Sequence, residues 1–65
     1  MKIKNFLRHL QHHNCLQIRG GGNHSIFQNQ VDKKISSVPR HNEVKNNLVR
    51  KICRDLEIPV PDNFQ

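Results

Sequence analysis

The sequence contains no tryptophan and no tyrosine, and phenylalanine occurs only three times. Proteins that bind single-stranded nucleic acid by stacking place several exposed aromatic rings along a basic groove. The three phenylalanines fall within apolar patterns that indicate a structural role. We therefore expect no base-stacking platform on this protein.

Long apolar runs are also missing. No uncharged apolar stretch approaches the ~20 residues that a membrane-spanning helix requires. The start, Met1-Lys2-Ile3-Lys4, lacks the apolar segment of a secretory signal peptide. These absences favour a cytoplasmic protein that makes no membrane contact.

Cysteine is scarce, with only Cys15 and Cys53 and no C-x-x-C arrangement. A secreted disulfide scaffold of this length usually carries four or more cysteines. We expect both residues to be small buried hydrophobes in a reducing compartment. A disulfide between them is the alternative.

Acidic residues are few: five Asp and Glu stand against eleven Lys and Arg, which gives a formal charge of +6. The electrostatic field of this positive charge attracts nucleic acid or other polyanions. The alternative is a basic surface that is merely solvated and binds no partner. A chain of 65 residues forms one domain with a thin core. We expect this domain over residues 1–60 and a flexible tail over 61–65. Because a deep cavity does not fit, an active site would lie on the surface and act on a large substrate.

Apolar spacing predicts the first elements. A one-sided apolar stripe predicts a helix from Ile3 that ends near Asn14, a residue that tolerates a left-handed backbone. Leu16 and Ile18 then alternate with polar residues, which predicts a strand with one covered face. The three glycines that follow are expected to break this strand. The members of the helical stripe are Ile3, Phe6, Leu7 and Leu10.

The second half predicts two more strands and a helix. Residues 24–28 and 34–38 are rich in strand formers and are joined by turn residues, so they should form a hairpin that Pro39 ends. Asn46 or Asn47 is expected to cap the last helix, which Pro59 and Pro61 stop. Its apolar stripe consists of Leu48, Val49, Ile52, Cys53 and Leu56. The order predicts an α+β fold: a three-stranded antiparallel meander with both helices on one face.

The segment from Gly20 to His24 holds the most informative chemistry. Glycine lets another backbone or a phosphate approach closely, and histidine both takes and gives a proton near neutral pH. If Phe27 faces the helices, His24 lies with Ile26 on the open face of the sheet. The reverse assignment places His24 at the edge of the core. A lone histidine at the start of a strand is more often structural than catalytic, so these residues alone leave both roles open.

The chain resembles the HicA family of bacterial and archaeal toxins, small endoribonucleases that are paired with HicB antitoxins. The similarity extends from Met1 to about Pro59. It is carried by four pieces in a fixed order: Lys2 to Leu7, Gly22-Asn23-His24 leading to Phe27, Val38-Pro39-Arg40-His41 with Glu43, and the helix around Leu48, Ile52 and Leu56.

This resemblance implies a fold like that of a double-stranded-RNA-binding domain, with the order α-β-β-β-α. It also implies that His24 is catalytic, since the family has its catalytic histidine after a glycine-serine pair. Here Asn23 stands where serine is usual, and asparagine tolerates the same turn. A second departure is Asn46-Asn47, where the family often has glycine-threonine. The implied partners are messenger RNA and a HicB-like antitoxin that forms a hetero-oligomer with an otherwise monomeric toxin.

The chemistry required is limited, because RNA supplies its own nucleophile, the 2′-hydroxyl group. A base, an acid and positive charge near the phosphate suffice. His24 is the predicted proton-transfer group, and His41 is either a second one or a phosphate contact. No cofactor and no metal ion are expected, since His9 and His13 alone do not complete a four-ligand zinc site. The residues expected to contact RNA are Arg19, Gly22, Asn23, Lys33, Lys34 and Arg40. The alternatives are a non-catalytic RNA-binding module of the same fold and a regulatory module that docks on a protein.

Overall fold

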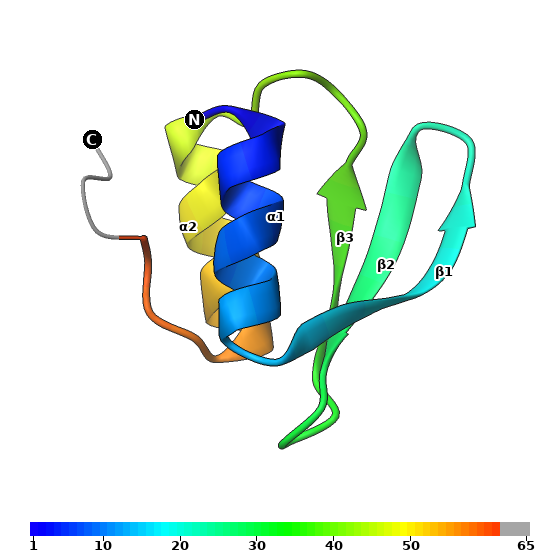
Figure 1. Cartoon of the computed structure of the whole chain (residues 1–65), viewed down its shortest axis with the longest axis vertical. Helices are drawn as coiled ribbons and strands as arrows, with labels where there is room; N and C mark the ends of the chain where they lie inside the picture. Colours follow the sequence, from blue (N-terminus) through cyan, green and yellow to red (C-terminus); the bar gives the residue numbers. More distant parts are fainter. Residues whose placement is uncertain (62–65) are drawn as a thin grey trace.

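The computed structural model describes residues 1–61 and has the predicted element order. The elements are α1 (Ile3–His12), β1 (Cys15–Gly21), β2 (His24–Asn29), β3 (Ile35–Pro39) and α2 (Asn46–Leu56). The strands form one antiparallel sheet in the order β1-β2-β3, and the two helices lie side by side against it (Figure 1). The predicted α+β fold is therefore confirmed.

The predicted tail and the predicted absence of membrane-spanning segments were also compared with the structure. Of the predicted tail 61–65, Pro61 is buried, and residues 62–65 lie outside the described part of the chain. Within residues 1–61, neither helix has the length and hydropathy needed to cross a membrane.

The core forms where the helical stripes meet the covered face of the sheet. Its fully or nearly fully buried members are Phe6, Leu10, Cys15, Phe27, Val38, Val44, Val49, Ile52, Cys53 and Leu56. Both cysteines are free as well as buried, which confirms their expected role as small hydrophobes. Burial raises the pKa of the Cys53 thiol to about 11, with a smaller contribution from Cys15. The thiols therefore remain protonated at neutral pH.

Cys15 is the one residue of β1 in this core, and Leu16 and Ile18 do not face it. Leu16 and Ile18 are 48% and 50% exposed, so the expectation that they belong to the covered face is wrong. Gln17, opposite the buried Phe27, occupies the covered side instead. A β-bulge between Gln17 and Arg19 then shifts the register.

The glycines also behave differently from the prediction. Gly20 and Gly21 are part of β1, paired with Ser25 and His24, and do not break it. Only Gly22 has a positive φ, of 58°. A glycine in an extended conformation continues a ladder, so the strand runs on until the backbone turns at Gly22.

Strand β3 is shifted by one residue from the predicted 34–38 and includes Pro39. Because β3 lies at an edge of the sheet, a residue without an N–H group is tolerated there. Ile35, its first residue, is 55% exposed and lies on the open face with Leu16, since both are paired with Gln28.

The start of α2 is set by backbone pairing rather than by an asparagine cap. The N-cap is Lys45, which makes no side-chain cap hydrogen bond, so the predicted capping by Asn46 or Asn47 is wrong. The preceding Val44 donates to the Met1 carbonyl at 2.8 Å and accepts from the Met1 nitrogen at 3.0 Å. This pairing keeps the chain extended through Lys45, and the helix begins immediately after it.

Helix α2 ends before the prolines that were expected to stop it. Glu57 has a left-handed backbone, with φ 55°. The Ile58 N–H donates to the Cys53 carbonyl at 2.9 Å, and the Glu57 N–H donates to the Arg54 carbonyl at 3.1 Å. This Schellman motif satisfies the last carbonyls of the helix. Asn14 takes the same left-handed conformation after α1, with φ 61°, as its position predicts.

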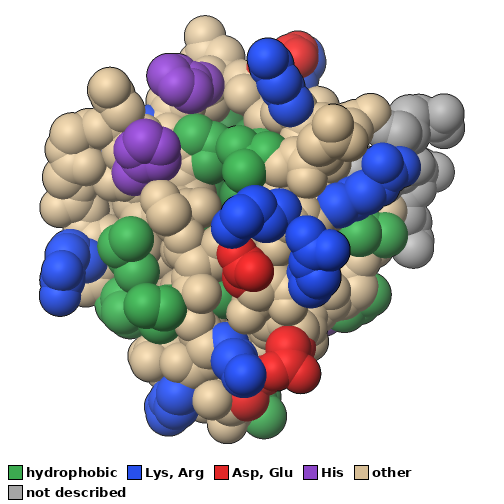
Figure 2. Space-filling view, turned by 180° about the vertical axis from the view of Figure 1, so that it is seen from behind, with side chains coloured by type: hydrophobic (Ala, Val, Ile, Leu, Met, Phe, Trp, Pro, Cys, Tyr) green, Lys and Arg blue, Asp and Glu red, His purple; other side chains and the backbone are tan. Residues whose placement is uncertain are grey.

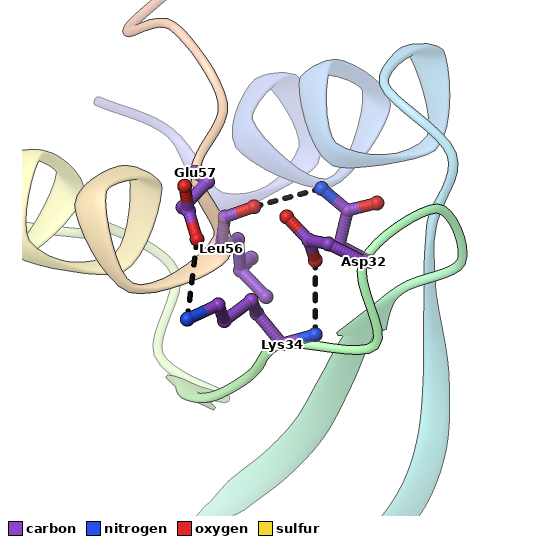
Figure 3. Close-up of polar contacts among 5 residues, drawn as sticks. Asp32, Lys34, Leu56 and Glu57 are labelled. Atoms are coloured by element: carbon purple, nitrogen blue, oxygen red, sulfur yellow. Dashed lines mark hydrogen bonds and ion pairs between the residues drawn. The ribbon is translucent and has the colours of Figure 1, made fainter.

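A buried asparagine joins the sheet to α2. The Asn29 side chain donates to the Leu56 carbonyl at 2.7 Å and accepts from the Val31 N–H at 2.9 Å. Beside this contact, Lys34 and Glu57 form an ion pair of 3.2 Å (Figure 3). Asn29 thereby connects the end of β2, the following turn and the end of α2.

We predict that Asn29→Ala lowers the free energy of unfolding by about 2 kcal/mol, because it leaves a buried carbonyl and a turn N–H without partners. Urea denaturation followed by circular dichroism measures this change. The matched control is Asn5→Ala on the exposed side of α1, which should change stability by less than about 0.5 kcal/mol. Equal effects of the two substitutions would show that the Asn29 contacts contribute nothing.

Candidate functional site

The turn between β1 and β2 determines the position of His24. Gly21 and His24 form the last pair of the ladder, which leaves a two-residue turn of Gly22 and Asn23. Gly22 has a positive φ and Asn23 does not, the pattern of a type II′ hairpin turn. Asparagine and serine both suit the second position of such a turn, so Asn23 fits the local geometry as well as the serine that the resemblance implies there.

His24 lies on the open face of the sheet. Ser25, Phe27 and Asn29 are buried on the helix side, while His24 and Ile26 alternate with them, which is the first of the two assignments that the sequence left open. The His24 side chain is exposed, and within residues 1–61 no hydrogen bond or ion pair engages it.

The residue across from His24 is Gly21, where an added Cβ would meet no atom within 4 Å. The space beside the imidazole is therefore open on the β1 side. A polymer backbone can approach it closely there.

The segment after β3 is hydrogen-bonded to the β1–β2 turn at this end of the sheet. The Arg40 N–H donates to the Asn23 carbonyl at 2.9 Å, which holds the chain after Pro39 against the β1–β2 turn. His41 follows and is exposed. The β1–β2 turn and the β3–α2 connection lie at the same end of the sheet in Figure 1. The predicted residues His24, Arg40 and His41 therefore gather at one end of the protein.

The Arg40 side chain nevertheless lies on the side of the sheet opposite to His24. Its Nε donates to the hydroxyl of the buried Ser25 at 3.0 Å. Its Nη2 lies over Gly20, where an added Cβ would come within 2.7 Å of it. The guanidinium is thus held against the helix-facing side of β1 and β2.

Arg19 is the cation that shares the face of His24. It lies opposite Ile26, so it is a diagonal neighbour of His24 across the β1–β2 ladder. Such diagonal positions are roughly 7–8 Å apart, within reach of a long side chain. Arg19 is exposed. This arrangement suits the binding of a phosphate between the two side chains.

The two predicted RNA-contacting lysines lie elsewhere. Lys33 and Lys34 follow the β2–β3 turn at the opposite end of the sheet (Figure 1). The length of β2 separates them from His24 by roughly 17 Å. Lys34 is also paired with Glu57. The structure does not bring these lysines to the histidine.

Apolar side chains on the open face were missed as a surface feature by sequence reasoning. Leu16, Ile18 and Ile35 are about half exposed, and Ile26 between them is partly buried. Alternation fixes that Leu16 and Ile18 share a face, but it does not say which face. A space-filling view shows apolar side chains close to histidine side chains on the same side of the molecule (Figure 2).

His9, His12 and His13, at the C-terminal end of α1, form a separate cluster. The rings of His9 and His13 are 4.6 Å apart, and His9 Nε2 lies 2.7 Å from the Pro59 carbonyl oxygen. Burial lowers the pKa of His13, and charge on His9 and His12 lowers it further. Within residues 1–61, no three His, Cys, Asp or Glu side chains form a group that could hold a metal ion.

We predict that Gly22→Ala lowers the free energy of unfolding by about 1–2 kcal/mol, because alanine is strained at positive φ. Gly21→Ala is the matched control: its added methyl meets open space, so the change should be below about 0.5 kcal/mol. Urea denaturation of both variants measures the difference. Comparable losses in the two would contradict the turn geometry described above.

Comparison with known protein families shows which family the chain belongs to. The model of a family described as the HicA toxin of bacterial toxin–antitoxin systems matches residues 3–58 of the 65 residues. Searches of the curated proteins and of the solved structures gave no match. The matched range contains every element of the fold and the whole cluster around His24. The chain belongs to the HicA toxin family.

Proposed function

We propose that this toxin is a metal-independent endoribonuclease that cleaves messenger RNA, with His24 as its catalytic residue. The observation that carries the proposal is the exposure of His24 on the open face, opposite a glycine and diagonal to Arg19. Membership of a toxin family and the net charge of +6 support it. A shallow site of this kind suits a polymer better than a small molecule.

The reaction needs only groups that this end of the sheet can supply. The His24 imidazole accepts the proton of a 2′-hydroxyl group as its oxygen attacks the adjacent phosphorus. The bond from phosphorus to the 5′-oxygen breaks, and that oxygen takes a proton from His41 or from water. The products are a 2′,3′-cyclic phosphate and a 5′-hydroxyl end. Arg19 stabilises the negative charge that develops on the phosphate oxygens.

A HicB-like antitoxin is the proposed partner. The open face combines half-exposed apolar side chains with the charge of Arg19 next to His24. A partner with apolar residues at its centre and carboxylates at its rim is complementary to this surface. Its binding would cover the histidine and so block cleavage.

The second candidate function is a non-catalytic RNA-binding module of the same fold. One observation favours it: within residues 1–61 no group holds the His24 ring in a fixed orientation, whereas catalytic histidines usually have such a partner. A regulatory protein-docking module is the third candidate, and the apolar open face is the feature that favours it.

The central prediction concerns His24→Ala. Loss of the proton-transfer group should reduce cleavage of a defined RNA by at least about 100-fold, measured on gels in the presence of EDTA. The matched control is His12→Ala, an exposed histidine on α1, which should cleave like the wild type. Circular dichroism and antitoxin binding should be unchanged in both variants.

The same assay separates the alternatives. Full activity of His24→Ala would contradict its catalytic role. RNA binding by the wild type without cleavage would favour the non-catalytic module. Inhibition of the wild type by EDTA would contradict a metal-independent reaction.

A further prediction distinguishes Arg19 from Lys34 as a contact to RNA phosphate. Arg19→Gln should weaken RNA binding and reduce by about one the slope of log affinity against log salt, because a phosphate contact is lost. Lys34→Gln should leave both nearly unchanged, since Lys34 lies at the far end of the sheet and is paired with Glu57. Fluorescence anisotropy over a salt series measures both quantities. A larger effect of Lys34→Gln would place the RNA at the other end of the sheet.

A further inference from the structure

A hollow of about 240 Å³ opens between α1 and the helix-facing side of the sheet. Ile3 and Leu7 of α1 form one wall, and Phe27 and Val38 lie on the sheet side. Leu7 is 38% exposed because nothing in the described chain covers it. The walls are thus apolar and remain accessible from outside.

The polar groups of the hollow come together on one side. Gln17, Ser25 and Arg40 line it, and the Ser25 hydroxyl fixes the guanidinium by accepting from its Nε. The Nη2 of Arg40 and the Nε2 of Gln17 converge over Gly20, at 2.7 and 2.8 Å from an added Cβ. Only a residue without a side chain leaves room for both groups there.

This hollow lies next to the His24 site but on the other side of the sheet. Ser25 directly follows His24, and the pairs Gly21–His24 and Gly20–Ser25 are adjacent rungs of the ladder. Across both rungs β1 presents only glycine at an edge of the sheet. A nucleic acid strand can therefore cross this edge with its phosphate on the His24 side and a base on the other.

We propose that the hollow receives one nucleobase of the RNA beside the scissile phosphodiester, and that guanine fits it best. A base has apolar faces and a polar edge, which matches apolar walls with a few convergent polar groups. The N–H donors of Arg40 and Gln17 suit the O6 and N7 acceptors of guanine. The claim that the bound base lies beside the scissile bond rests on the proposed function. The claim that the hollow binds a base does not depend on it.

The observations favour a base over an antitoxin side chain. The hollow is lined by Ser25, Pro39 and Arg40 at the end of the sheet that carries His24, and its polar groups gather at the Gly20–Ser25 rung next to His24. The half-exposed apolar patch that suits a protein partner is on the opposite face. Arg40 has no ion-pair partner within residues 1–61, so its donors remain available.

Two substitutions test the proposal. Leu7→Trp replaces a leucine side chain in the wall of the hollow by a larger indole ring, which fills the hollow. Gly20→Ala displaces the ends of Arg40 and Gln17, which are flexible, so the fold is retained while the donors move. The matched control is Val31→Trp, at a turn residue that is 78% exposed and far from the hollow.

Two readouts are needed. The first is the sequence profile of cleavage sites in an RNA pool with a randomised segment. The second is anisotropy with four uncleavable 2′-O-methyl octanucleotides of uridine that carry a single central G, A, C or U. In the wild type we expect guanine at one fixed position of the profile and roughly tenfold tighter binding of the G-containing octanucleotide. Leu7→Trp should abolish both preferences and Gly20→Ala should weaken them, while Val31→Trp keeps them.

The outcomes separate this inference from the proposed function. Selective binding without any cleavage would support the hollow as a base site and overturn the nuclease. Cleavage without a base preference, or a preference that survives Leu7→Trp, would overturn the base site and leave the nuclease standing. A Leu7→Trp variant that keeps the RNA preference but loses antitoxin binding would assign the hollow to the protein partner, which also overturns the inference.

Discussion

The burial of Phe27 is the constraint on which the rest of the site depends. Side chains of a strand alternate between its two faces, so placing this ring in the core also assigns Ser25 and Asn29 to the helix side and His24 and Ile26 to the open side. A slip of one residue would exchange all of these positions. It would bury the imidazole of His24 and expose the phenyl ring of Phe27. The position of His24 on the open face is therefore held by an apolar residue that takes no part in the proposed proton transfer.

The sequence predicts what depends on a regular period and misses what depends on a local choice. The face of His24 follows from Phe27, and the left-handed end of α1 follows from Asn14. The side on which Leu16 and Ile18 lie does not follow from alternation, because a period fixes relative faces only. The bulge before Arg19 is likewise invisible in residue types, yet it places this cation on the face of His24.

Contacts between distant segments were equally beyond sequence reasoning. Val44 is buried because the chain around it pairs with Met1, and no periodic pattern surrounds it. Arg40 passes to the helix side because Ser25 and Gly20 offer it a hydroxyl and a space. Its position in the sequence indicates only that it lies near His24. The proximity of Arg40 to His24 was thus predictable, but neither the remote position of Lys33 and Lys34 nor the division of the residues near His24 between two faces was.

The two buried cysteines have a consequence for how such a toxin is controlled. A thiol that stays protonated and is shielded from solvent reacts slowly with oxidants and with other thiols. Oxidative conditions therefore find no exposed sulfur of this kind through which to inactivate the protein. A change in the redox balance around the protein should therefore leave both thiols of the core intact.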